Sequence, residues 1–268
     1  MSALTFTLKA SLQQRVDLSP LTPDNLAGKN PADIAVTLLV SGREKLRADN
    51  LFDISGDDAS DIVFNNANGK LDFIGSQMKT GKITVNGGAG SYLGLQMRGG
   101  HIVLNGNADA FAASEMANGL IEIKGSTGDF LAAALPGNRK GMKGGMVLIS
   151  GNVGERAGDQ MRRGIILIEG NAGGYLASRM LAGTIGVLGS VGDYVGYGMR
   201  RGTLLLTKEP KLHATLQDCG THTLPFLSLM FKSFRNLPSK FASINQNRVQ
   251  RYAGDIANDG KGEILVFK

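Results

Sequence analysis

The stretch MKTGKITVNGGAGSYLGLQMRGGHIVLNG, residues 78–106, decides the fold because it contains one pattern twice, nineteen residues apart. Seven methionines continue this pattern at intervals of 19, 19, 26, 19, 19 and 19 residues: Met78, Met97, Met116, Met142, Met161, Met180 and Met199. Glycines three positions later keep step: Gly81, Gly100, Gly119, Gly145, Gly164, Gly183 and Gly202. The longer interval holds a loop inserted within Ala133–Lys143. So regular a spacing predicts a repeat fold.

A three-residue apolar segment follows each Met-x-x-Gly. The first and third residues are apolar, as in Ile83 and Val85, while the middle residue varies freely, as Thr84 does here. This alternation with a period of two is typical of a strand with one buried face. The segments begin at Ile62, Ile83, Ile102, Ile121, Val147, Ile166, Ile185 and Leu204.

A unit of nineteen residues with one strand is too short for a helical repeat or a four-stranded propeller blade. The remaining solution winds each unit once around a common axis, so that equivalent strands pair in parallel roughly 4.8 Å apart. We therefore predict an all-β fold, a parallel and right-handed β-helix solenoid of about seven rungs. A glycine-rich antiparallel barrel or sandwich would not repeat its side chains at a constant interval.

The two ends of the chain depart from the repeat. Residues 1–60 are expected to form an N-terminal cap, because solenoids need atypical units over their terminal edges. Its strand candidates are Leu4–Leu8, Ala35–Val40 and Leu51–Ile54. The repeat occupies residues 61–207. Residues 208–268 form a docking tail with a short apolar helix, Leu224–Phe231, for which Thr223 is the expected N-cap and Pro225 lies in the first turn.

Composition limits the setting of the protein. The 268 residues carry a formal net charge of +6, which predicts an acidic partner or ligand, with nucleic acid a less favoured candidate. The single cysteine, Cys219, excludes an internal disulfide and suits a reducing cytosol. We expect a cytoplasmic protein, because the N-terminus lacks the apolar core of a signal peptide and no apolar run is long enough to span a membrane.

The sequence offers few residues that could form a catalytic or metal-binding site. His101 stands just before a repeat strand, where other units have lysine, leucine or methionine. Cys219 and His222 supply two potential ligands, fewer than a zinc site needs. We therefore predict no catalytic residue, no metal site and no cofactor bound by this chain alone.

Basic residues recur beside the methionines, and equivalent positions of successive rungs lie above one another. They would form a basic stripe along one corner: Lys79, Arg98, Lys143, Arg162 and Arg200, with Arg163 and Arg201 next to it. Stacked like charges repel unless solvent or an anion screens them. The stripe is either a track for an acidic partner or an ordinary solvated corner, with salt bridges to a neighbouring subunit as a further alternative. The solvated corner is the simpler interpretation.

Several outward-facing middle positions are apolar where solvent favours polar residues. These are Val103, Leu148, Leu167 and Leu205. Such a strip is typical of an interface, so we expect contact with a partner, the alternative being cover by the chain's own tail.

The repeated unit resembles the glycine-motif domain at the C-terminus of the glutamate synthase large subunit, and equally the C subunit of formylmethanofuran dehydrogenase. The tail favours the second family. Pro210-Lys-Leu, Gly220-Thr-His-Thr-Leu-Pro-Phe-Leu, Tyr252-Ala-Gly-Asp and Gly260-Lys-Gly-Glu look like its bacterial members, which belong to the formyltransferase/hydrolase complex of methylotrophic bacteria.

The resemblance implies a structural subunit of a cytosolic assembly. A formyltransferase subunit would move a formyl group from formyl-tetrahydromethanopterin to a methanofuran-type carrier with a glutamate-rich tail. An amidohydrolase-type subunit holding metal would then release formate, and the B subunit would complete the assembly. Two alternatives remain: the C subunit of a molybdenum or tungsten formylmethanofuran dehydrogenase, and a stand-alone solenoid that binds polyanions. Copurification would discriminate the three.

Overall fold

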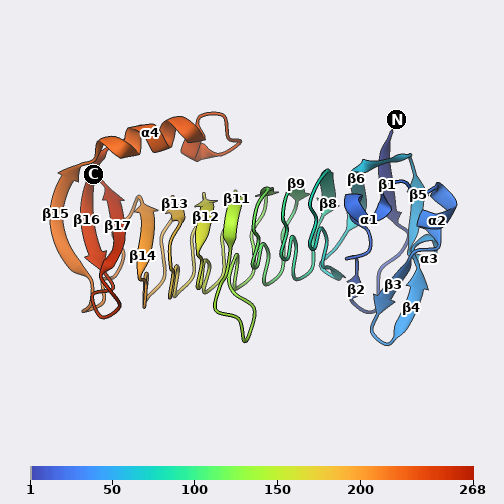
Figure 1. The fold of residues 1–268 in the computed structure, drawn as a ribbon, viewed down its shortest axis with the longest axis horizontal. Helices are drawn as coiled ribbons and strands as arrows, with labels where there is room; N and C mark the ends of the chain where they lie inside the picture. Colours follow the sequence, from blue (N-terminus) through green and yellow to red (C-terminus); the bar gives the residue numbers. More distant parts are fainter. Residues whose placement is uncertain (1) are drawn as a thin grey trace.

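The computed structural model describes residues 2–268, and it is built mainly from strands (Figure 1). Thirteen strands form one large sheet in the order β15-β16-β17-β14-β13-β12-β11-β10-β9-β8-β6-β1-β5. The repeat contributes β6 (Asp58–Ala67), β8 (Lys82–Gly87), β9 (His101–Asn105), β10 (Leu120–Ile123), β11 (Lys143–Ile149), β12 (Arg163–Ile168), β13 (Thr184–Val187) and β14 (Arg201–Leu206). All neighbours within this group pair in parallel. The prediction of an all-β chain with a large parallel sheet is confirmed.

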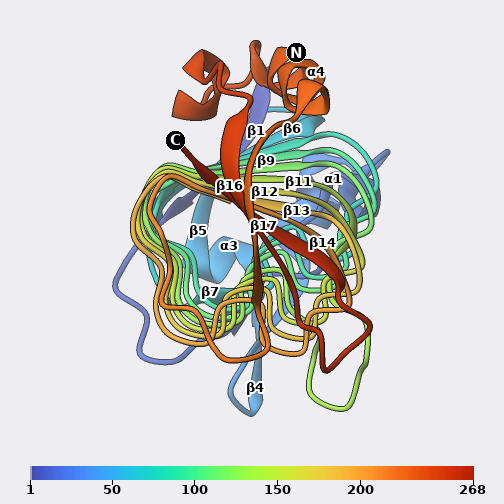
Figure 2. The same cartoon turned by 90° about the vertical axis from the view of Figure 1, so that its left-hand side faces the viewer.

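The pairing register follows the sequence repeat. Ile83 lies opposite Ile102, and Ile166 lies opposite Ile185, nineteen residues apart in each pair. A second parallel ladder links single residues on another side of each coil: Ala89, Ala108, Thr127, Val153, Ala172 and Val191. Seen from the end, the coils superimpose on one another (Figure 2). Equivalent residues of successive units are therefore aligned along both ladders.

The repeat methionines pack closely against the repeat glycines of the following coil. Gly100 has a φ of 83°, and a Cβ added there would lie 2.5 Å from Cε of Met78. Gly119 stands in the same relation to Met97, at 2.8 Å. Every repeat methionine is buried, with at most 1% of its surface exposed. Each methionine thus fills space that a side chain on the glycine of the following coil would need.

The N-terminal residues extend the stack with shorter elements. The strand β1 (Ala3–Leu8) pairs in parallel with β6 and antiparallel with β5 (Phe52–Ser55). A smaller sheet has the order β4-β3-β2-β7, and three short helices accompany it. These elements are β2 (Val16–Asp17), α1 (Pro23–Leu26), α2 (Pro31–Ala35), β3 (Leu38–Ser41), β4 (Glu44–Arg47), α3 (Ala48–Leu51) and β7 (Leu71–Asp72).

The sequence-based limits of two of these strands were wrong. The strand expected at Ala35–Val40 begins only at Leu38, because Ala35 ends α2, whose N-cap Asn30 and Pro31 start a helical turn. The strand expected at Leu51–Ile54 begins at Phe52, because Leu51 still belongs to α3. Leu4–Leu8 lies within β1, as predicted.

One arginine fastens this end to the repeat. Arg15 donates from Nε and Nη2 to the two carboxylate oxygens of Asp72, both at 2.7 Å, and from Nη2 to Asp109 at 2.9 Å. Asp72 and Asp109 belong to different coils of the stack. A bidentate arginine–carboxylate pair fixes orientation as well as distance, so Arg15 holds the N-terminal elements in register with the first coils.

The C-terminal residues return to the stack after an excursion. The strand β17 (Lys261–Phe267) pairs in parallel with β14, and a Cβ at Gly262 would lie 2.8 Å from Cε of Met199. It therefore takes the place of a further coil. The strand β16 (Arg248–Gly254) pairs antiparallel with β17, and β15 (Gln217–Thr223) pairs antiparallel with β16. The excursion contains helix α4 (Pro225–Phe234) and a 3-10 turn, η1 (Lys240–Ser243).

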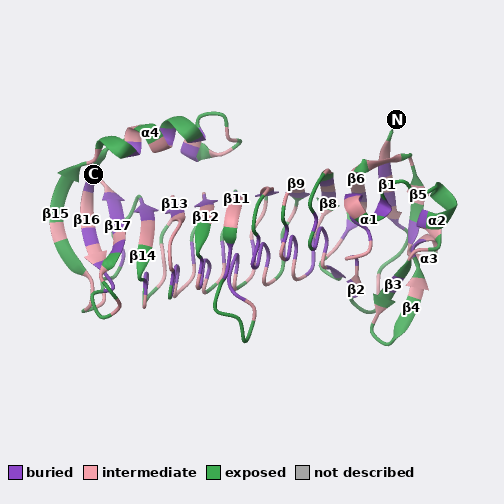
Figure 3. Ribbon diagram, viewed as in Figure 1, coloured by how far each residue is buried: buried purple, intermediate pink, exposed green. Residues whose placement is uncertain are grey.

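The tail covers the apolar outward strip, which corrects the expectation of partner contact there. Leu148, Leu167 and Leu205 are at most 4% exposed and pack in one cluster with side chains from α4, η1 and β16: Leu227, Phe231, Phe234, Phe241 and Val249. Phe241 lies over Gly186, where an added Cβ would be 2.5 Å from its ring. Val103 on β9 is outside this cluster and half-buried. Figure 3 colours each residue by burial and shows buried, intermediate and exposed residues along α4.

The start of the tail helix also differs from the expectation. Thr223 ends β15, and Leu224 is the N-cap, without a side-chain hydrogen bond. Pro225 is the first helical residue, where its missing N–H costs nothing. Within the described residues 2–268, no helix is long and apolar enough to cross a bilayer.

The fit between methionine and glycine makes a prediction for stability. Gly164 has a φ of 103°, and a Cβ there would lie 2.8 Å from Cε of Met142. We expect Gly164→Ala to lower the free energy of unfolding by about 3 kcal/mol, from backbone strain and overpacking together. Urea denaturation would measure the change.

Gly137→Ala is the matched control for this prediction. Gly137 also has a positive φ, 86°, but an added Cβ would meet nothing within 4 Å. This variant should lose only about 1 kcal/mol, the cost of the backbone conformation alone. Equal losses in the two variants would contradict the role of methionine in the packing.

Candidate interaction surfaces

The basic residues lie in one column. In each coil after the first, the residue that follows the methionine donates its backbone N–H to the carbonyl of the methionine one coil earlier, as Arg98 does to Met78 at 2.7 Å and Arg162 to Met142 at 2.8 Å. The five predicted stripe residues are all exposed: Lys79, Arg98, Lys143, Arg162 and Arg200. Ala117 and Leu181 occupy the same column and interrupt the charge. The structure therefore brings the predicted residues together, as two adjacent pairs and one single cation.

Most of these charges have no carboxylate beside them. Lys143 lies 3.4 Å from Glu115. Among residues 2–268, the other four stripe side chains make no ion pair. An anion that binds between neighbouring cations one coil apart lowers the free energy, because it offsets their mutual repulsion. The stripe is thus a surface that can hold an extended anion, although nothing in the geometry requires one.

Glu115 anchors the inserted loop. Its carboxylate is 4% exposed and accepts hydrogen bonds from the Leu135 N–H at 3.3 Å, from Gln96 at 3.1 Å and from Asn138. Partial burial works to raise the pKa of Glu115, but these hydrogen bonds and the charge of Lys143 outweigh it and lower that pKa. The carboxylate therefore stays ionised and holds the loop at neutral pH.

An aromatic ladder runs along another corner, and sequence reasoning missed it. Phe73, Tyr92, Phe111 and Phe130 stack with ring centroids 4.8 to 5.3 Å apart, and Tyr175 stacks on Tyr194 at 4.8 Å. Arg156 occupies the rung between the two groups, 4.4 Å above the ring of Tyr175. The rings recur at the same nineteen-residue interval as the methionines, so the signal was present in the sequence.

Two cavities lie beside this ladder and share Arg179 as a wall. One, of about 450 Å³, lies between the inserted loop and the rings of Phe111 and Phe130. The other, of about 400 Å³, lies among Arg156 and three tyrosines. The guanidinium of Arg179 is bound to the buried carboxylate of Asp159, Nε to Oδ1 at 3.0 Å. Its charge is therefore neutralised within the chain.

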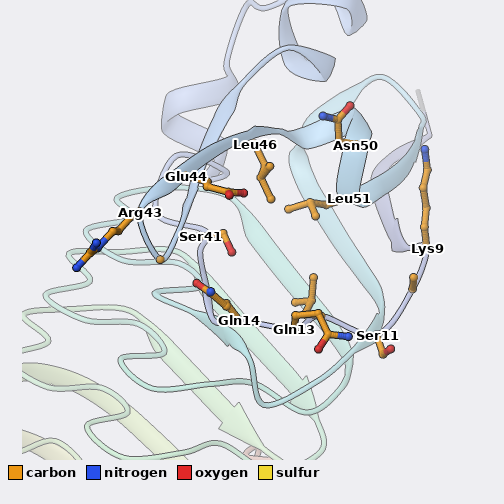
Figure 4. A pocket seen from close by; sticks show the side chains of 13 residues that line it. Lys9, Ser11, Gln13, Gln14, Ser41, Arg43, Glu44, Leu46, Asn50 and Leu51 are labelled. Atoms are coloured by element: carbon orange, nitrogen blue, oxygen red, sulfur yellow. The ribbon is translucent and has the colours of Figure 1, made fainter.

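A further cavity, about 740 Å³, lies at the N-terminal end (Figure 4). The linker 9–14 and the β3–β4 turn line it, with Leu46 and Leu51 as apolar walls. Arg43 points away from the space, and Lys9 pairs with Asp53 at 3.4 Å. The remaining polar side chains are mostly amides and hydroxyls, an ordinary lining for a surface hollow.

The histidines and the cysteine have structural partners. His101 lies 2.8 Å from Glu122, which also accepts from Lys124 at 2.7 Å. His222 Nε2 lies 2.8 Å from the carbonyl oxygen of Cys219. Over residues 2–268, no group of three or more His, Cys, Asp or Glu side chains is arranged to hold a metal ion.

The tail motif ending in Asp255 joins the C-terminal strands to the last coil. Asp255 is 2% exposed and accepts from the N–H groups of Gly198 and Ala257, both at 3.0 Å. Burial works to raise the pKa of Asp255, but its hydrogen bonds with Thr215, Gly198, Ala257 and Asn258 lower that pKa. Tyr252 of the same motif donates to Glu209. These residues stabilise the tail rather than form a reactive site.

Comparison with known proteins gives one family match and two relatives, one of them over nearly the full length. The GXGXG motif family matches residues 67–223. The C subunit of the formyltransferase/hydrolase complex Fhc of Methylorubrum extorquens is 47% identical over 262 residues, 98% of each chain. The C subunit of the tungsten-containing formylmethanofuran dehydrogenase 2 of Methanococcus maripaludis is 29% identical over 92 residues, 34% of each chain.

A solved structure agrees with the sequence matches. It is the crystal structure of the formyltransferase/hydrolase complex FhcABCD from Methylorubrum extorquens in complex with methylofuran. One chain of it superimposes with a TM-score of 0.94 and 36% identity, covering 98% of this chain and 99% of that chain.

The anchoring by Glu115 predicts how the loop responds to substitution. Glu115→Ala removes the acceptor for Leu135 and Asn138, so the loop should open more often. We expect trypsin to cleave after Arg139 and Lys140 at least several-fold faster, as followed by mass spectrometry. Glu155→Ala, an exposed acidic control, should leave the rate unchanged. Equal rates in all three proteins would contradict the anchor.

The same carboxylate gives the sign of a pH dependence. Because its pKa lies below the ordinary value of about 4.5, the anchoring is fully present above that value and is lost as pH falls through the lowered pKa. Hydrogen exchange of the loop amides, corrected for intrinsic rates, should accelerate only below pH 4.5. Acceleration between about pH 7 and pH 5 would contradict the assignment.

Proposed function

We propose a function from one established premise: the chain belongs to the GXGXG-motif family and, within it, to the C subunits of formyltransferase/hydrolase complexes. It serves as the non-catalytic structural subunit of such a complex. This proposal rests mainly on the share of the chain that each relative matches. The Methylorubrum relative matches from end to end, tail included, whereas the tungsten dehydrogenase subunit matches over only 34% of the chain. The dehydrogenase subunit remains the second candidate.

The finer architecture follows from the same premise. The stack is a parallel, right-handed β-helix solenoid of about seven rungs at residues 61–207, between a cap at 1–60 and a docking tail at 208–268. Two parallel ladders per coil support the solenoid. Right-handedness is the general rule for connections between parallel strands.

In the complex, this rod holds together the subunits that perform the chemistry. A formyltransferase subunit transfers the formyl group from formyl-tetrahydromethanopterin to a methanofuran-type carrier, and an amidohydrolase-type subunit with metal releases formate in the cytoplasm. The B subunit is the third partner. The methylofuran in the related crystal structure supports a carrier of this type.

The basic stripe guides the acidic tail of the carrier between those subunits. Lys79 with Arg98, and Lys143 with Arg162, are exposed cations on successive coils, spaced for a chain of carboxylates. The alternatives are a solvated corner and ion pairs with a neighbouring subunit. Both predict that the carrier ignores these residues.

Charge reversal tests the stripe. In the assembled complex, Arg98→Glu combined with Arg162→Glu should raise the KM for the formylated carrier about tenfold at low salt, equivalent to about 1.4 kcal/mol. The difference should shrink near roughly 0.5 M salt, because exposed charges are screened. Initial rates of formate release measure both values.

Arg43→Glu combined with Lys45→Glu is the matched control, since both residues are exposed and lie on the distant β3–β4 hairpin. This variant should keep the wild-type KM at every salt concentration. A stripe variant whose KM also stays at the wild-type value would exclude the guiding role.

Copurification tests the function as a whole. A tagged chain expressed at its native level should retain formyltransferase and hydrolase subunits, and the eluate should release formate from the formylated carrier. A molybdopterin-containing partner would instead support the dehydrogenase alternative. A soluble monomer without partners would support a stand-alone solenoid that binds polyanions.

A further inference from the structure

Helix α4 has two apolar faces, and only one of them is used within the chain. Leu227, Phe231 and Phe234 are at most 2% exposed and pack against the outward side of the sheet. On the other side, Phe226 is 43% exposed and Leu229 is 69% exposed. A helix that only covered its own sheet would have a polar outer side.

The exposed residues form a short ridge. Phe226, Leu229 and the half-buried Met230 stand at positions i, i+3 and i+4, so their side chains adjoin along one side of the helix. The buried face fixes the helix in place through its contacts with the outward leucines of the repeat strands. The outer ridge is therefore held in one orientation before any partner arrives, which lowers the entropic cost of binding.

The surroundings of the outer ridge are basic. From Cys219 to Gly254 the sequence contains five lysines and arginines and no aspartate or glutamate. Lys240 pairs with Glu169 at 3.4 Å and Arg251 with Glu263 at 3.2 Å. The other three cations are exposed and make no ion pair within residues 2–268: Lys232, Arg235 and Arg248.

We infer that the outer ridge of α4 docks into an apolar pocket bordered by carboxylates on a neighbouring protein subunit of the complex. Aromatic and aliphatic side chains in such a pocket supply the binding free energy, while Lys232 and Arg235 meet the acidic border and set the orientation. This inference rests on the proposed function, because it needs a complex in which the neighbour is present.

Two other occupants fit the observations less well. A second copy of this chain would bring the basic surroundings of two ridges together, and like charges across an interface oppose association. A membrane surface would favour the helix lying with its wider apolar face in the lipid. Here that wider face packs on the sheet, and only the narrow ridge remains outside.

Site-specific cross-linking tests the inference. The chain, with p-benzoylphenylalanine at position 229, is co-expressed with the other subunits of the formyltransferase/hydrolase complex and irradiated after purification. We expect one cross-linked product with a different subunit, at a peptide carrying aspartate or glutamate. Leu229→Ser should weaken retention of that subunit about tenfold without lowering Tm, because the side chain is largely exposed. Lys232→Glu with Arg235→Glu should weaken it most at low salt.

The control and the contradicting outcomes separate the two proposals. Arg43→Glu with Lys45→Glu, the same charge change at the other end of the rod, should leave retention unchanged. If the wild-type chain fails to assemble with the co-expressed subunits, the proposed function itself fails. If it assembles but position 229 cross-links to nothing or to a second copy, the docking inference alone is overturned. Binding to anionic vesicles that Leu229→Ser abolishes would overturn it as well.

Discussion

The whole structure depends on one close approach, repeated along the rod. Cε of each repeat methionine lies 2.5 to 2.9 Å from where a Cβ would stand on a glycine of the following coil. Both residues must therefore recur at the same interval along the sequence. That interval sets the number of residues in each turn. Once the turn has nineteen residues, every other position becomes a column. The basic stripe, the aromatic ladder and the apolar outward strip are consequences of that period.

This dependence explains why so much of the fold could be predicted from the sequence. Strand positions, the parallel register and the inserted loop all follow from counting residues between methionines. The three short helices near the N-terminus could not be found this way, since four or five residues show no periodicity. The bidentate contact between Arg15 and Asp72 joins residues far apart in the chain, so no local pattern announces it.

The surfaces were predicted less completely than the coils. Counting residues from the methionines placed the basic stripe in one column. It could not predict the ion pair of Lys143 with Glu115, because that contact depends on the path of the inserted loop. Partner contact was expected over Leu148, Leu167 and Leu205, and the tail covers them instead. The glycine at position 186 could have indicated this cover, because a glycine among outward-facing residues leaves room for a large side chain such as Phe241. The chain thus covers one apolar surface with its own tail, while other apolar side chains, such as Leu229, stay exposed.

The central claim is that each nineteen-residue unit makes one complete turn. In that register Asn86 lies opposite Asn105, and their side chains are hydrogen-bonded at 2.8 Å. With Cys219→Ser as background, Asn86→Cys and Asn105→Cys should form an intramolecular disulfide on mild oxidation, because adjacent parallel strands lie about 4.8 Å apart. Asn86→Cys with Lys124→Cys, two turns apart, should not. Mass spectrometry showing the second bridge, or neither, would contradict the account.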